Sequence, residues 1–141
     1  MALPSVGGGY QFNDGNLNEL KLSVSQAPAT AAGAATLTVA QLINGIILGS
    51  PGSSAAAYTL PLASDVDATL TNAKVGSFFD FSVINVDGSG SGVITMTTNT
   101  GWSIGTSGSQ GLMTVAATAG TVRRFRAVRT AAGAWSLYAL S

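Results

Sequence analysis

The segment at residues 77–86, SFFDFSVINV, alternates apolar and polar side chains with a period of two. In an extended chain Phe79, Phe81 and Val83 lie on one side, and Asp80 and Ser82 lie on the other. This alternation is typical of a β-strand that buries one face, whereas a helix would spread the same residues around its surface. The segment therefore predicts a central strand of a β-sheet.

Shorter apolar runs follow the same rule along most of the chain, and turn residues separate them every ~8–12 residues. The runs that we expect to form strands lie at 36–39, 57–61, 77–86, 93–98, 102–104, 112–116, 122–130 and 135–140. A glycine-rich connection at 87–92 predicts a hairpin between two of them. We therefore predict an all-β domain at residues 36–141, with a jelly-roll-like β-sandwich or small barrel as its architecture.

Residues 1–35 have a different character, because glycine, alanine and turn residues dominate them. We predict an extended N-terminal arm with an Ala/Thr-rich hinge, since such residues cannot build a core. Ordering the arm costs about 1–2 kcal/mol per residue, so its few large apolar side chains cannot hold it against one partner. Several arms on one oligomer would bind together more tightly. The predicted anchors are Tyr10, Phe12, Leu17, Leu20 and Leu22.

Composition excludes several kinds of chemistry. The chain has no His and no Cys, so the usual catalytic triads and the zinc, haem and iron–sulfur ligand sets are ruled out. Its net charge of zero argues against a nucleic-acid-binding protein, and its longest apolar stretch is too short to span a bilayer. We therefore expect no catalytic residues, no cofactor, no metal, no nucleic-acid partner and no membrane partner.

Four of the six cationic residues gather in the segment Arg123-Arg124-Phe125-Arg126-Ala127-Val128-Arg129. On a strand, Phe125 would point into the core while Arg124 and Arg126 point outward. Two interpretations remain open: a solvated strand protected by charge, or a contact with carboxylates of a partner chain.

Two acidic residues, Asp65 and Asp67, lie two positions apart beside Ser64. They could form a catalytic carboxylate pair, but a helix start at 65–70 with Ser64 as its cap explains them better. Similarly, the glycine-rich run at 88–92 is followed by a strand instead of a helix, which favours a loop over a phosphate-binding motif.

Several segments of the β domain resemble head decoration (cement) proteins of tailed bacteriophages, particularly those of marine and cyanobacterial hosts. They are 37–42 (LTVAQL), 45–49 (GIILG), 58–61 (YTLP) with the short helix after it, 75–85 (VGSFFDFSVIN), 124–126 (RFR) and 135–138 (WSLY). The resemblance covers residues 36–141. It implies a trimeric β-sandwich on the outer capsid surface, with an arm that reaches over neighbouring major capsid proteins.

Our first hypothesis is therefore a structural virion protein that stabilises a phage capsid by bridging major capsid proteins, as a homotrimer. The alternative is a receptor- or glycan-binding domain of a phage fibre or tail tip. That alternative needs an exposed aromatic side chain beside polar groups, and Trp102, in the loop after Asn99, is the best candidate.

Overall fold

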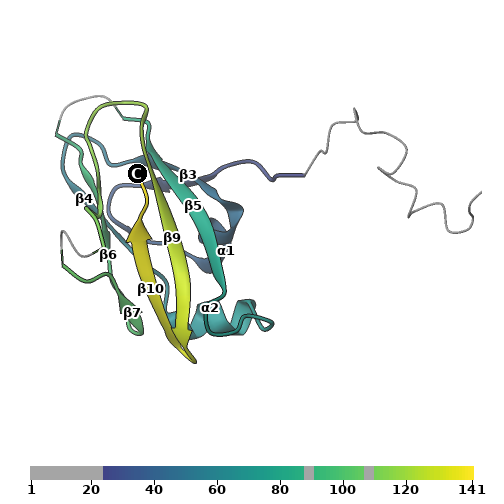
Figure 1. Ribbon diagram of the computed structural model, residues 1–141. Helices are drawn as coiled ribbons and strands as arrows, with labels where there is room; N and C mark the ends of the chain where they lie inside the picture. The colour runs from purple at the N-terminus through teal and green to yellow at the C-terminus, as the bar shows by residue number, and fades with distance from the viewer. Residues whose placement is uncertain (1–23, 88–90, 107–109) are drawn as a thin grey trace, which may run out of the picture.

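The computed structural model describes residues 24–87, 91–106 and 110–141. These residues form two β-sheets, packed together, and two short helices (Figure 1). The strands are β1 (Ala29–Ala32), β2 (Ala35–Thr36), β3 (Ile46–Ser50), β4 (Ala56–Thr59), β5 (Phe78–Asn85), β6 (Ile94–Thr97), β7 (Trp102–Ser103), β8 (Thr114–Val115), β9 (Thr121–Ala131) and β10 (Ala134–Ala139). The helices are α1 (Val39–Asn44) and α2 (Ala63–Thr69).

One sheet has six strands in the order β1-β3-β5-β9-β10-β7, and the other has four in the order β2-β4-β6-β8. Figure 1 shows the long strands β5, β9 and β10 side by side, with β4 and β6 in a separate layer. Neighbouring strands are parallel in five of the pairings and antiparallel in the other three: β5 with β9, β9 with β10, and β6 with β8. The all-β prediction is confirmed at the level of two packed sheets. The parallel pairings differ from the antiparallel arrangement of a jelly roll.

The alternation in the sequence places the side chains of β5 as predicted. Phe81 and Val83 are buried between the sheets, whereas Asp80 and Ser82 lie on the other face. Antiparallel pairing sets Phe81 opposite Phe125 of β9, and their rings stack with centroids 5.5 Å apart. Phe125 is fully buried, which confirms its predicted place in the core.

Both helices contribute to the core from connections between strands. Thr38 caps α1 through a reciprocal capping box with Gln41, in which each side chain accepts a backbone N–H of the other residue. Leu42 of α1 and Val66 of α2 are fully buried. No helix in the described ranges has the length and apolar character that a bilayer crossing requires.

Three local predictions need correction. The sheet begins at Ala29, inside the predicted hinge, because β1 pairs in parallel with β3 there, and the Tyr58 hydroxyl donates to the Ala31 carbonyl at 2.8 Å. Strands β5 and β6 do not form the predicted hairpin, since they belong to different sheets. The helix predicted at 65–70 begins at Ala63 after Leu62, and no side chain caps it, so Ser64 is not its cap.

Candidate interaction surfaces

The chain enters the domain through an exposed segment at residues 24–28, which has no regular secondary structure. Val24 is fully exposed, and Ala31 is the first core residue in the described part of the chain. Two side chains of α1 hold the segment where it joins the sheet: Asn44 Nδ2 donates to the Ala27 carbonyl and Gln41 Nε2 to the Thr30 carbonyl, both at 2.8 Å. The entry point is therefore fixed, and it leads into β1 at the edge of the six-stranded sheet.

The five predicted arm anchors lie outside the described residues. They are Tyr10, Phe12, Leu17, Leu20 and Leu22. The entry point shows where the chain that carries them joins the domain.

The face of the six-stranded sheet that points away from the core carries several exposed apolar side chains, and we call it the outer face. It consists of the outward side chains of β3, β5, β9 and β10 and of the residues that directly follow β5 and β10. Of the eleven exposed large hydrophobic residues in the described part of the chain, six belong to it: Ile46, Phe78, Val86, Val122, Tyr138 and Leu140. Proteins rarely leave so much apolar side chain together in contact with water unless it binds something.

The outward face of the four-stranded sheet is different in chemistry. The register of β2, β4, β6 and β8 brings threonines together there: Thr36, Thr59, Thr95, Thr97 and Thr114. Thr59 and Thr97 hydrogen-bond to each other through their hydroxyls at 3.0 Å. This face is polar and uncharged, whereas the outer face carries both apolar and charged side chains.

An ion cluster occupies the middle of the outer face. Asp80 of β5 accepts hydrogen bonds from Arg126 Nε at 2.7 Å and from an Arg124 guanidinium nitrogen at 2.6 Å. These bonds, that of Arg126 first, hold the pKa of the Asp80 carboxyl below its usual range. The Arg126 guanidinium also lies 4.0 Å from the centre of the Phe78 ring, at cation–π distance.

The predicted outward orientation of Arg124 and Arg126 is confirmed, since both share the outer face with Asp80. Their carboxylate partner belongs to the same chain, which was not part of either interpretation. The sequence did contain a signal: Asp80 and Arg126 are both outward residues of long strands, and only the pairing of β5 with β9 was missing.

A second ion cluster closes the end of the sandwich, where α2 meets β9 and β10. Asp67 accepts two hydrogen bonds from Arg129, at 2.9 and 2.8 Å, one from the indole Nε1 of Trp135 at 2.8 Å and one from the backbone N–H of Gly133 at 2.7 Å. Arg129, whose pKa this partner raises, also donates to the Ala73 carbonyl. The Arg129 side chain is 17% exposed and that of Asp67 19%. Asp67 therefore joins α2 to the β9–β10 end of the sandwich. The prediction that it stabilises the first turn of the helix is wrong.

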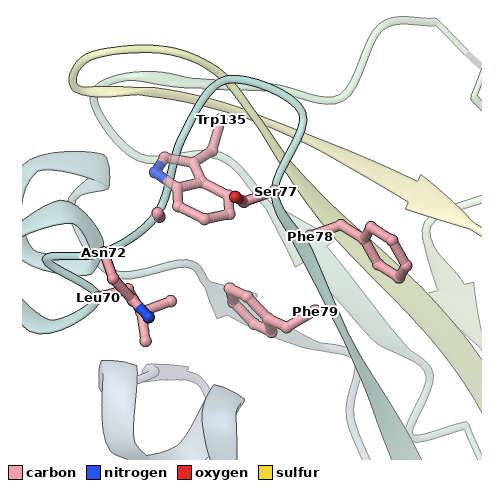
Figure 2. A pocket seen from close by; sticks show the side chains of 7 residues that line it. Leu70, Asn72, Ser77, Phe78, Phe79 and Trp135 are labelled. Atoms are coloured by element: carbon pink, nitrogen blue, oxygen red, sulfur yellow. The ribbon is translucent and has the colours of Figure 1, made fainter.

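A hollow of about 280 Å³ lies between this cluster and the outer face. In Figure 2, the Trp135 and Phe79 rings lie on opposite sides of it, with Leu70 and Asn72 at one end. The ring of Phe78 points away from the hollow, although its residue contributes to the rim. The arrangement offers space for one apolar side chain or small group.

Trp102, the aromatic candidate for glycan binding, is not exposed. Only 8% of its surface is accessible, and its indole Nε1 donates to the Pro61 carbonyl at 2.7 Å. It packs 6.1 Å from the Trp135 ring because β7 pairs with β10 in register, Trp102 beside Trp135. The prediction of an exposed loop tryptophan is therefore wrong.

Comparison with protein-family models, with curated proteins and with solved structures finds no match to this chain.

Proposed function

We propose that this chain is a structural virion protein that decorates the outer surface of a phage capsid. In this proposal it acts as a trimer and bridges neighbouring major capsid proteins, and it has no catalytic role. The resemblance of residues 36–141 to head decoration proteins suggests the class. The position at which the N-terminal segment joins the domain supports the mechanism.

That entry point is the observation on which the proposal depends. Among the described residues, the buried core begins at Ala31, and residues 24–28 before it are exposed. Residues 24–28 add no buried side chain to the described core, and in this proposal Tyr10, Phe12 and the three leucines of the arm bind another surface. In this proposal the hydrogen bonds from Asn44 and Gln41 fix the base of the arm to α1, beside the edge of the six-stranded sheet.

The proposed binding mechanism is cooperative. One arm with five apolar anchors binds weakly, because ordering its backbone costs about 1–2 kcal/mol per residue. Three arms on one trimer dock one after another, and each docking after the first is intramolecular. Binding to the assembled lattice and not to dispersed subunits would stabilise the shell by mass action.

The finer description of the domain as jelly-roll-like belongs to the same proposal and rests on the resemblance. Two packed sheets support a sandwich, whereas the parallel pairings of β1, β3 and β5 set this chain apart from an antiparallel jelly roll. The glycan-binding alternative needs an exposed aromatic side chain, and its candidate, Trp102, is buried.

The test uses assembled capsids of the phage that encodes the chain. Deleting residues 1–25 is expected to abolish co-sedimentation with capsids, while circular dichroism and thermal unfolding show a folded domain. Asn44 and Gln41 keep their backbone acceptors in this variant, because Ala27 and Thr30 remain.

Two full-length variants test whether binding depends on the apolar anchors themselves and not only on the length of the arm. The triple change Tyr10→Ser, Phe12→Ser and Leu20→Ser is expected to weaken capsid binding at least tenfold. The matched change Asn13→Ser, Asn16→Ser and Asn18→Ser, in the same arm, leaves it unchanged. Full capsid occupancy by the truncated chain would show that the arm mechanism is wrong.

A further inference from the structure

We propose that Asn44 is a site of spontaneous deamidation, and that its conversion to aspartate loosens residues 24–28 where they enter the domain. The modification is a property of the folded domain, so it does not depend on the proposed function. Three features support it: the residue that follows Asn44, the hydrogen bonds around this pair, and the access of water to the side-chain amide.

The first feature is the glycine that follows. Asn44 and Gly45 form the one Asn-Gly pair in the sequence. Deamidation begins when the backbone nitrogen of the next residue attacks the asparagine Cγ, and glycine obstructs this approach least because it has no side chain. A Cβ built at Gly45 would meet nothing within 4 Å, so a ring that forms at this peptide bond has room within the fold.

The second feature is the position of the pair at the end of α1. Gly45 is the C-cap, with a φ of +91°, and its N–H donates to the Leu42 carbonyl at 3.2 Å. A bond of this length at a helix end is easily opened, because the ends of helices fray. The bond from the Ser82 N–H uses the Gly45 carbonyl, so freeing the Gly45 nitrogen leaves it in place.

The side-chain amide of Asn44 is oriented by two further groups. The Ile46 backbone N–H donates to Oδ1 at 3.4 Å, and Nδ2 donates to the Ala27 carbonyl at 2.8 Å. A donor at Oδ1 stabilises the negative charge that this oxygen gains when the attacking nitrogen bonds to Cγ. An open hollow of about 430 Å³, which Asn44 lines together with Val24 and Ile43, gives water access to the amide.

The reaction needs water alone as a reagent. The Gly45 nitrogen gives up its proton and bonds to Asn44 Cγ, the Cγ–Nδ2 bond breaks, and the amide nitrogen leaves with that proton as ammonia. Water then opens the succinimide ring at one of its two carbonyls. Opening at the Cγ carbonyl gives aspartate, and opening at the backbone carbonyl gives isoaspartate, in which the chain runs through Cγ.

The product cannot hold the entering segment as asparagine does. An ionised carboxylate only accepts hydrogen bonds, so aspartate cannot replace the bond from Nδ2 to the Ala27 carbonyl. Its oxygens would instead face that carbonyl, which is also an acceptor. Gln41 still donates to the Thr30 carbonyl, so β1 keeps its contact with α1 while residues 24–28 loosen.

The first experiment incubates the folded full chain in mildly alkaline buffer and locates deamidated residues by peptide mass spectrometry. Asn44 is expected to convert at least tenfold faster than Asn72, an exposed asparagine that precedes alanine. Asn44→Gln should lose this conversion, because its longer side chain would have to close a six-membered ring. Conversion of Asn44 in urea but not in the folded chain, or a rate equal to that of Asn72, would overturn the proposal.

The second experiment tests the consequence with Asn44→Asp, and Asn72→Asp is the control that adds the same charge. Heteronuclear NOE values of the backbone amides report motion on the picosecond to nanosecond timescale. The values for residues 24–27 are expected to fall in Asn44→Asp and to stay unchanged in the control, while those of β5 stay unchanged in both. Unchanged values in Asn44→Asp, or equal losses in the two variants, would contradict the loosening of this segment.

Discussion

Replacing Gly101 with alanine is expected to lower the free energy of unfolding by about 3–5 kcal/mol. Gly101 has a φ of +86°, and a Cβ there would lie 2.4 Å from the Gly133 carbonyl oxygen and 2.5 Å from the Ala63 Cβ. Neither neighbour can move easily, because the carbonyl belongs to the β9–β10 turn and Ala63 is buried. The change also disturbs the backbone bond from Trp135 to the Gly101 carbonyl. Urea unfolding followed by tryptophan fluorescence measures the loss.

Gly120→Ala is the matched control for the backbone conformation. Gly120 has nearly the same φ, +84°, but a Cβ there meets nothing within 4 Å. Its expected cost is about 1–2 kcal/mol, the usual cost of a left-handed residue that carries a side chain. Equal losses in the two variants would contradict the close approach of Gly101 to the β9–β10 turn.

Asp67→Ala is expected to cost about 3 kcal/mol at neutral pH, which is a large share of the stability of a small domain. The change removes the acceptor of Arg129, of the Trp135 indole and of the Gly133 backbone N–H at once. The Arg129 guanidinium then stays largely enclosed without a carboxylate. Asp65→Ala, two residues away on the exposed side of the same helix, is the control and should change stability by less than about 0.5 kcal/mol.

The pH dependence gives this prediction a second readout. The hydrogen bonds from Arg129, then the other donors, hold the pKa of Asp67 well below its unfolded value of about 3.9. The ionised group therefore stabilises the fold above about pH 4, and this contribution is lost as pH falls through the lower folded pKa. The stability difference between wild type and Asp67→Ala should shrink as the pH is lowered from 7 toward 2. A difference that is independent of pH would show that the ionised carboxylate is not its source.

The sequence predicts which side chains of the long strands point into the core and which point outward. A period of two assigns Phe81 and Val83 to the core and Asp80 to the surface without knowledge of neighbouring strands. The same rule places Phe125 inside and Arg124 and Arg126 outside. These assignments are local, so they depend little on the rest of the chain.

Sheet topology could not be predicted in the same way, because it depends on which strands pair. The glycine-rich connection after β5 favoured a hairpin, yet the chain crosses there to the other sheet. Parallel neighbours such as β3 and β5 are brought together across a connection that contains β4 and α2. No local pattern in the sequence encodes that arrangement.

The same limit applies to the ion clusters and the hollow. Asp67 and Arg129 are 62 residues apart, and neither has a sequence neighbour that predicts the other. Trp102 follows a turn and lies in a short segment, which suggested exposure, but its pairing with β10 carries it into the core. The outer face could be recognised only once β3, β5, β9 and β10 were known to be neighbours.

The central claim is that this chain acts by binding to an assembled viral shell. The most direct measurement is cryo-electron microscopy, with mass spectrometry, of virions purified from a lysate in which the chain is produced. The account predicts the chain in the virion, as density at repeated positions on the outer capsid surface that span neighbouring major capsid proteins. Its absence from purified virions, or its presence only inside the shell, would contradict the account.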